Sequence, residues 1–598
     1  MVDFKHNYDG IDMGEDRLEL PKRVTSASVE GRAWFARGWL HILNYNHEEA
    51  IECFKHCICV EDSCIMALWG IAYSLSSNYN YPPGFGSGYD AIQAAIQRLG
   101  SQEIMYSELE RDLIFALASR SSSEAKAAID PAAMFFGNPS ELNVKYSDEM
   151  SKVYEKHPGN LDVAALYGES LLVLRPWAMW VRDAESGKIV PASPSTLVAK
   201  DILEAALQTP GGMEHPAILH LYCHLMELSD DPLAAKPAAD VLRTLYPKAS
   251  HLTHMASHID VWAGCYKDAM TVNISSVDTD NEIVEFTGCE SNFFKGYRFH
   301  NIHMAAWAAS FCGKREVAMA MGRATETMLK PKDENSGVKQ MLAGGIPSGQ
   351  LYYEPYLMTK WHMMIRFGMW DEILAEPLPE NATLYATTFA TAHYARGIAY
   401  AAKGLVDEAE IEQAHYLEAM KNPALTGRLM HTNVIISDEG PCILKVGEAM
   451  LAGEIEYRKG NFEEAFERLH EAVRLDRGLQ YDEPWGWLVP AEHALGALLL
   501  EQGRVEEATN VFRRYQAKFL SLRLSNLEMF KNNMWGLLGL YQCLKQAGDP
   551  EAMEVQRRFD EASSMADVKL QATCFCASAA GAKVTRAMTD QEACCGEV

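Results

Sequence analysis

The segment AWFARGWLHILNYNHEEAIECF, residues 33–54, contains the pattern that decides the fold. Two apolar stretches with helical periodicity flank a short polar turn at 44–46. Gly38 lies in the middle of the first stretch, and Ala50 lies twelve positions later, near the start of the second. Small residues at these places let two antiparallel helices approach closely. The segment therefore predicts a helical hairpin.

The same spacing of small residues recurs along the chain. Each copy brackets a short turn with Gly, Asn or Asp, the residues that helix ends and turns favour. Hairpins repeated in this way are typical of tetratricopeptide repeats (TPRs). The sequence therefore predicts an all-α fold, a TPR-like α-solenoid made as a superhelix of antiparallel helix pairs. The further copies are Ser257 with Ala269, Ala306 with Ala318, Gly397 with Ala409, Gly453 with Ala465, and Gly496 with Ala508.

The extent of the repeats sets the expected domain boundaries. We predict a solenoid over 31–570, an N-terminal extension at 1–30 and a Cys-containing tail at 571–598. Stretches rich in Gly, Pro or Ser predict loop insertions near 78–90 and 175–197. No linker-like composition divides the solenoid, so we expect it to be continuous.

Charge and hydropathy limit the classes of partner. Asp and Glu number 81 against 54 Lys and Arg, which gives a net charge of -27. Such a surface repels phosphate backbones, so nucleic acid is not an expected partner. The sequence has no run of the roughly 20 apolar residues that span a bilayer and no export or transit signal. We therefore expect a cytoplasmic protein without membrane insertion. The sequence does not indicate its oligomeric state.

The chain contains 14 cysteines. Most occur singly within helical apolar patterns, which suits reduced core thiols rather than a disulfide framework. Cys574, Cys576, Cys594 and Cys595 stand apart in the C-terminal tail. A thiol or metal-handling role and an inert tail are the two alternatives for this group.

Histidines are concentrated between residues 220 and 303. This segment contains seven of the 19 histidines, where the chain average predicts about 2.7. His220 and His224 are spaced i, i+4 and so share a helix face, and His254 and His258 repeat the arrangement. The two pairs are 34 residues apart, which is the length of one repeat. Equivalent positions of adjacent repeats lie side by side, so we expect the pairs to converge.

A third repeat continues this register. If Ala306 is its small residue, His303 falls at the place of His254 and His300 at the place of His251. Three consecutive repeats should then present imidazoles to one small volume of the concave groove. Imidazoles packed together without a ligand repel one another when protonated and lack partners when buried. A bound metal ion relieves both problems, because imidazole is the commonest metal ligand.

These considerations predict a transition-metal site. Nitrogen ligands favour copper or iron, with zinc as the third candidate, and argue against Mg²⁺ and Ca²⁺. Binding of a peptide or of a substrate carboxylate is an alternative, and coincidence is another. The preferred ligands are His220, His224, His254, His258 and His303, with His251 and His300 in reserve.

Four more residues are candidates for proton transfer or for orienting ligands. Tyr222 and Glu227 lie on the first histidine helix, and Glu227 could add one oxygen ligand. Tyr353 lies on the repeat that follows the third histidine-bearing repeat, and His393 lies on the repeat after that. Each of the four, taken singly, is also compatible with a packing or surface role.

The histidine segments resemble a family of large TPR proteins of bacterial type. Its members carry an HxxxH helix, an HLxHMxxHI helix and an HNxHF helix. The matching segments here are HPAILHLYCHLMELSDDPLAAKPAADVL at 215–242, HLTHMASHIDVWAGCYKDA at 251–269 and HNIHMAAWAAS at 300–310. The segment RPWAMW at 175–180 departs from the family at Ala178, where an acidic residue is expected. The resemblance implies the fold and the histidine site, and it implies no particular reaction.

The sequence as a whole predicts a His-coordinated metalloenzyme. An oxidoreductase is favoured over a hydrolase, with a small organic molecule bound in the concave groove as substrate. The main alternative is a non-enzymatic TPR scaffold that binds a peptide or protein partner in the groove. A metal buffer without turnover is the third interpretation.

Overall fold

The computed structural model describes residues 8, 11–25, 28–80, 88–122, 140–183, 185–287, 294–329, 349–517, 532–578 and 585–586. Part of the loop predicted near 78–90 lies outside these residues, as do Cys594 and Cys595. Helices dominate the described part of the chain, where the strands form only short two-stranded pairs. The predicted class, an all-α TPR-like α-solenoid, is confirmed. No helix within the described ranges is both long and apolar enough to cross a bilayer.

The chain divides into two compact units. Unit 1 contains residues 1–259 and 275–297, and unit 2 contains residues 260–274 and 298–598. Three helices contribute residues to both units, namely α14 (Ala256–Ala263), α15 (Tyr266–Thr287) and α16 (Lys295–Phe311). The expectation of one continuous superhelix remains a prediction.

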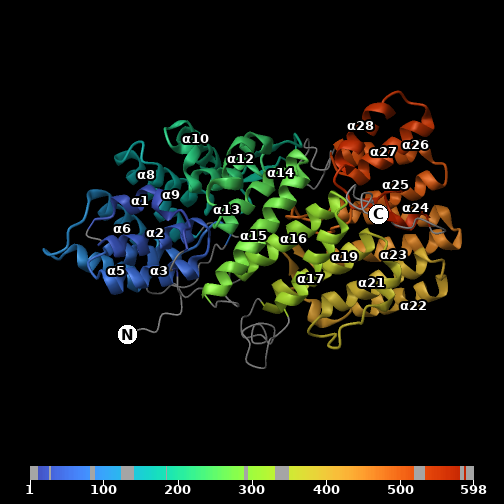
Figure 1. The fold of residues 1–598 in the computed structure, drawn as a ribbon, viewed down its shortest axis with the longest axis horizontal. Coiled ribbons are helices and arrows are strands. Elements are labelled where there is room, and N and C mark those ends of the chain that lie inside the picture. The colour runs from blue at the N-terminus through green and yellow to red at the C-terminus, as the bar shows by residue number, and fades with distance from the viewer. Residues whose placement is uncertain are drawn as a thin grey trace, which may run out of the picture. The chain divides into compact units, whose positions relative to one another are not determined.

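Unit 1 consists of helices that pack on their neighbours in the sequence. Helix α2 packs on α3, and α9 packs on α10, as the blue and teal ribbons show (Figure 1). The bounds are α1 (Glu19–Arg23), α2 (Val29–Leu43), α3 (His47–Val60), α4 (Ile65–Ser74), α5 (Tyr89–Leu99), α6 (Glu108–Ala118), α8 (Glu141–Lys156), α9 (Leu161–Leu172), α10 (Pro194–Gln208), α11 (Pro216–Met226), α12 (Lys236–Leu245) and α13 (Ser250–His254).

The first hairpin shows why the small residues recur. The ring of Phe54 on α3 is fully buried between α2 and α4. A Cβ atom added at Gly38 on α2 would lie 2.7 Å from this ring, and one added at Gly70 on α4 would lie 2.5 Å from it. Glycine at these positions therefore lets three helices pack around a single aromatic side chain.

The insertion predicted near 175–197 contains a short antiparallel hairpin of β1 (Trp180–Arg182) and β2 (Ile189–Pro191). The indole nitrogen of Trp180 donates a hydrogen bond to the carbonyl of Leu225 on α11, at 2.6 Å. Helix α10 begins directly afterwards, at Pro194. The described part of the insertion thus packs against the first histidine helix.

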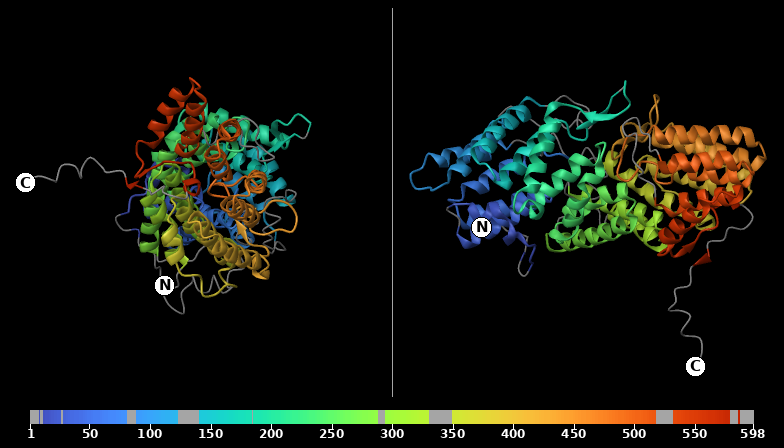
Figure 2. Two further views of the ribbon diagram at one scale, coloured as in Figure 1. Left: turned by 90° about the vertical axis from the view of Figure 1, so that its right-hand side faces the viewer. Right: turned by 90° about the horizontal axis from the view of Figure 1, so that it is seen from above.

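Unit 2 repeats the same pairing. Helices α21 with α22, α23 with α24, and α27 with α28 pack as hairpins, seen from two further sides in Figure 2. A Cβ atom at Gly496 on α25 would lie 2.4 Å from the Phe512 ring on α26. The bounds are α17 (Arg315–Leu329), α19 (Met358–Arg366), α20 (Trp370–Ala375), α21 (Ala386–Ala402), α22 (Val406–Ala419), α23 (Ile443–Lys459), α24 (Phe462–Arg477), α25 (Ala491–Glu501), α26 (Val505–Ala517), α27 (Met534–Ala547) and α28 (Ala552–Ser563), with short strands β3 (Leu429–Met430), β4 (Asn433–Val434), β5 (Val568–Lys569) and β6 (Thr585–Arg586).

Candidate metal centre

Helix α11 presents the first histidine pair. Pro216 occupies its first turn, where a missing N–H costs no hydrogen bond. The ring of His215, at the N-cap, accepts a hydrogen bond from the backbone N–H of Ile218 at 3.4 Å. The imidazoles of His220 and His224 lie one turn apart with ring centroids separated by 4.8 Å. The i, i+4 pattern therefore places both rings on one face, as predicted.

Helices α13 and α14 present three further imidazoles, those of His251, His254 and His258. Met255 separates the two helices, so His254 ends α13 and His258 lies in α14. Their rings still meet, with centroids 4.8 Å apart and Nε2 atoms 2.8 Å apart. The start of α13 is fixed by Asn44, the C-cap residue of α2, whose Oδ1 accepts hydrogen bonds from the backbone N–H groups of His251 at 2.8 Å and Leu252 at 3.2 Å.

Helix α11 on one side and helices α13 and α14 on the other bring five imidazoles together within unit 1. The ring of His251 lies 4.9 Å from that of His220 and 6.1 Å from that of His224. The candidate ligand nitrogens of these three side chains all lie within 4.8 Å of one another. The predicted convergence of adjacent repeats is therefore present in the described structure. We call His220, His224, His251, His254 and His258 the histidine cluster.

Glu227 links two members of the histidine cluster. It is the C-cap residue of α11, and its side chain is fully buried. One carboxylate oxygen lies 3.1 Å from Nδ1 of His224, and the other lies 2.6 Å from Nδ1 of His258. A carboxylate accepts hydrogen bonds, so it favours the tautomers of both rings that carry the proton on Nδ1. That choice leaves the Nε2 lone pairs directed away from Glu227.

Several ring nitrogens of the cluster have no hydrogen-bond partner in the described part of the chain. They are Nε2 of His220, Nε2 of His224 and both nitrogens of His251. All five cluster side chains are at most 2% exposed. Burying a polar atom without a partner costs about 1–3 kcal/mol. Such a concentration of unsatisfied nitrogens in one place calls for a ligand or for water.

The surroundings keep these imidazoles neutral. Burial, and secondarily the neighbouring imidazole of His258, lower the pKa of His220 to about 3. The pKa values of His224 and His251 are also far below the usual range, first through burial and then through the other rings of the cluster. Neutral imidazole is the form that binds metal ions.

Aromatic side chains cover the cluster. The Tyr45 ring lies 4.7 Å from that of His220 and 5.3 Å from that of His251, measured between centroids. The rings of Tyr79 and Trp177 lie 4.6 Å and 6.4 Å from that of His224. The repeat register predicts these imidazoles at the concave groove; in the described structure all five are buried, and aromatic residues from distant segments of unit 1 pack against His220, His224 and His251.

A small cavity adjoins the cluster at His220. Its volume is about 20 Å³, which is enough for one molecule of the size of water. Its polar lining includes Tyr45 and Tyr73, whose hydroxyls both donate hydrogen bonds to the carboxylate of Glu169. Burial raises the pKa of Glu169 above its usual range. Sequence analysis did not identify these three residues.

The last two predicted ligands, His300 and His303, belong to unit 2. The His300 ring stacks on that of His431, with centroids 5.1 Å apart. The His303 ring contacts that of Tyr356 at 5.2 Å, and neither of its nitrogens has a hydrogen-bond partner among the described residues. Burial lowers the pKa of His303 to about 3. Their participation in the site formed by unit 1 remains a prediction.

Three of the four predicted catalytic residues contact side chains outside the histidine cluster. The Tyr222 hydroxyl donates a hydrogen bond to Glu204 on α10 at 2.9 Å. In unit 2, the Tyr353 ring stacks on that of Phe299 with centroids 5.2 Å apart. Nδ1 of His393 lies 2.6 Å from the carboxylate of Glu412. Of the four candidates, Glu227 is the one that the structure brings into hydrogen-bond contact with the histidine cluster.

A match to a family model agrees with the repeat pattern at the first hairpin. A family model described as tetratricopeptide repeat matches residues 31–59, which lie in α2 and α3. No curated protein matches the chain. A solved structure similar to it is the human IFIT1 dimer with m7Gppp-AAAA, at 12% identity and a TM-score of 0.29, with 93% of this chain and 94% of that chain covered. The resemblance to the bacterial-type family with histidine motifs remains a prediction.

Proposed function

We propose that the chain binds a transition metal ion in the histidine cluster of unit 1. The observation that carries this proposal is the set of buried, unpartnered nitrogens on His220, His224 and His251. Packing alone would favour apolar side chains at these places, because unsatisfied buried nitrogens destabilise a fold. An ion that accepts their lone pairs offsets this cost.

The donor set fits such an ion. Imidazole nitrogens bind copper, iron and zinc at about 2.0–2.1 Å. Nitrogens that lie within 4.8 Å of one another can reach one ion through small rotations of the side chains. The buried carboxylate of Glu227 adds negative charge next to the cluster. The same carboxylate holds His224 with Nε2 available, which is the usual role of a residue behind a metal ligand, and it orients His258, whose Nε2 lies 2.8 Å from Nε2 of His254.

We further propose that the site belongs to an oxidoreductase with copper or iron as its metal. When bound, such an ion would supply electron transfer or dioxygen chemistry. The chain itself excludes bulk water with Tyr45, Tyr79 and Trp177. Beside His220 it leaves a cavity of about 20 Å³, which holds one molecule of the size of water. Glu169, with a raised pKa, could hold a proton at this cavity.

Metal analysis tests the proposal. The full chain, purified without a polyhistidine tag, should contain about one equivalent of copper or iron. A double variant with His224→Ala and His251→Ala should lose it. The matched control is His157→Ala, which removes a histidine of unit 1 that instead contacts Asp112 at 2.9 Å. Reduction by ascorbate, followed by electron paramagnetic resonance, distinguishes a redox metal from zinc.

The alternative scaffold interpretation predicts a different result from the same preparation. A chain that takes up no stoichiometric metal after incubation with copper, iron and zinc salts would contradict the proposed site. Equal metal contents of the double variant and the wild-type protein would do the same. Either outcome would leave a TPR-like scaffold as the function to be tested, by capture of a peptide or protein partner.

A further inference from the structure

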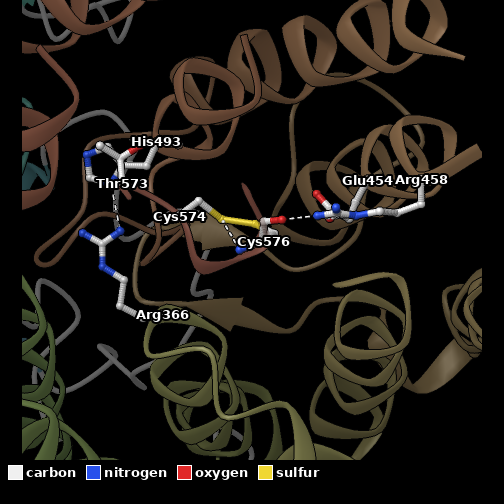
Figure 3. The surroundings of a disulfide bond; sticks show 7 residues. All are labelled: Arg366, Glu454, Arg458, His493, Thr573, Cys574 and Cys576. Atoms are coloured by element: carbon white, nitrogen blue, oxygen red, sulfur yellow. Dashed lines mark hydrogen bonds and ion pairs between the residues drawn. A yellow bond between two sulfur atoms is a disulfide. The ribbon is translucent and has the colours of Figure 1, made fainter. Parts of the chain in front are cut away.

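A pair of bonded cysteines lies in unit 2, near the end of the described chain. Cys574 and Cys576 form a disulfide with Cα atoms 5.3 Å apart and only one residue between them (Figure 3). The segment follows β5 and includes the single turn η8 (Phe575–Ser578). Nothing in the proposed metal site uses these sulfur atoms, since that site lies in unit 1.

This disulfide is poorly suited to be a structural crosslink. It joins neighbouring residues, so it connects no two elements of the fold. A disulfide that closes so short a loop removes less entropy from the unfolded chain than one that closes a long loop. Its contribution to stability is therefore at the low end for disulfides, and another role has to account for the pair.

Other contacts hold the segment in place. The Thr573 hydroxyl donates a hydrogen bond to the carbonyl of His493 on α25 at 3.0 Å. Arg458 on α23 donates to the carbonyl of Cys576 (Figure 3). The Phe575 ring packs edge-on against that of Trp535 on α27, with centroids 5.7 Å apart. Because these contacts do not involve sulfur, we expect the segment to stay docked whether the pair is oxidised or reduced.

The two sulfur atoms differ in solvent exposure. They line one cavity, whose lining also contains charged side chains. Cys574 is half-buried, whereas Cys576 is 4% exposed. Both line a cavity of about 30 Å³ together with Arg366, His493 and the carboxylate of Glu454. The Arg366 guanidinium lies 2.8 Å from Nδ1 of His493 and 3.7 Å from the centre of the Trp535 ring. The Glu454 carboxylate is paired with Arg458 at 2.6 Å. The cavity thus brings a guanidinium and a carboxylate to the same lining as the two sulfur atoms.

We propose that Cys574 and Cys576 form a thiol–disulfide exchange site that takes small thiols as its reductant. The thiolate of the first small thiol attacks Sγ of Cys574, the more exposed sulfur, and Cys576 leaves as a thiolate. The thiolate of a second small thiol then attacks the sulfur of the first and releases Cys574. The protein disulfide gains two electrons and two protons, and the two small thiols become one disulfide.

A redox titration of the full wild-type chain tests this proposal. The protein is equilibrated in buffers of reduced and oxidised glutathione, quenched with acid, alkylated, digested and examined by mass spectrometry. We expect the peptide that contains both cysteines to change reversibly between the doubly alkylated and the disulfide form in one two-electron step. A pair that stays alkylated in oxidising buffer, or stays oxidised in excess dithiothreitol without denaturant, would overturn the proposal.

Single variants test which sulfur is attacked. With oxidised glutathione, Cys576→Ser should form at least about tenfold more mixed disulfide than Cys574→Ser, because its remaining thiol is the accessible one. The matched control is Cys543→Ser, which removes a buried thiol of α27 and should leave the titration unchanged. Preferential labelling of Cys576 would contradict the assignment. Neither readout depends on metal content, so the result is independent of the proposed function.

Discussion

At the scale of single residues, Glu227 determines the orientation and the tautomer of two imidazoles in the histidine cluster. Its two carboxylate oxygens face Nδ1 of His224 and Nδ1 of His258, and it carries no exposed surface. These contacts are close enough to fix both ring orientations and both tautomers. A ligand set made by side chains from different helices depends on such a residue, because each imidazole otherwise rotates independently.

The substitution Glu227→Gln tests this role. An amide has one oxygen acceptor, so it can accept a hydrogen bond from only one of the two imidazoles, and the other loses its fixed tautomer. We expect the metal affinity to fall by about 10–100-fold while the fold is retained. Competition with a coloured chelator measures the affinity. Glu204→Gln on α10, which alters the contact with Tyr222 on α11, is the control and should retain wild-type affinity.

At the scale of elements, the fold positions the cluster through the ends of helices. Helix α13 has five residues, and its first backbone N–H groups are capped by Asn44 at the end of α2. The neighbouring Tyr45 adopts a left-handed backbone conformation, with φ of 54°, and places its ring against His220 and His251. Bulky residues adopt this conformation only where the surrounding structure holds them. The turn between α2 and α3 is thus part of the site.

The substitution Asn44→Ala tests this connection. It removes the acceptor for the backbone N–H groups of His251 and Leu252. We expect the free energy of unfolding to fall by about 0.5–2 kcal/mol, as for other lost helix caps, and metal binding to weaken as well. Chemical denaturation and chelator competition measure the two effects. Unchanged metal affinity in a clearly destabilised variant would show that the turn supports the fold alone.

The small residues of the hairpins lead to a second test at this scale. A methyl group at Gly38 would approach the buried Phe54 ring to 2.7 Å, so α2 and α3 would have to separate. We expect Gly38→Ala to destabilise the protein by about 1–3 kcal/mol. Gly159→Ala is a useful comparison, because no atom lies within 4 Å of its added methyl group and only its φ of 75° opposes the change. A melting temperature for Gly38→Ala equal to wild type would be inconsistent with close packing here.

Particular residues show what the sequence could predict. The hairpins followed from the spacing of Gly38 and Ala50, and the two histidine pairs followed from i, i+4 and repeat-length periodicity. Tyr45, Tyr79 and Trp177 could not be predicted as neighbours of the cluster. They come from turns and insertions with no helical period, and their contact with α11 depends on long-range packing. Burial of the imidazoles was missed for the same reason.

At the scale of the whole molecule, we expect the buried histidines of unit 1 to make stability depend on pH and, if the proposed site binds its ion, on metal. Burial lowers the pKa of His220 in the cluster to about 3, and that of His47 on α3, outside the cluster, to about 4, against about 6.5 when unfolded. The unfolded chain therefore binds more protons below pH 6.5. Each imidazole removes about 1.4 kcal/mol of stability per pH unit as the pH falls from 6.5 towards its folded pKa.

We therefore expect the metal-free protein to have a free energy of unfolding lower by a few kcal/mol at pH 5 than at pH 7. Denaturation by urea at the two pH values measures the difference. At pH 7, a bound metal should raise the melting temperature, because it binds the folded state preferentially. A chelator should reverse that increase. Equal stability at both pH values would contradict the burial of neutral imidazoles.

The most direct test is anomalous diffraction from crystals of the metal-loaded protein, recorded at the absorption edge of the metal. The account predicts a single strong peak at about 2.0–2.1 Å from imidazole nitrogens of the histidine cluster, His220, His224 and His251 among them. A fully loaded protein whose anomalous peak lies elsewhere, with the imidazoles of unit 1 in contact only with protein or water, would contradict it.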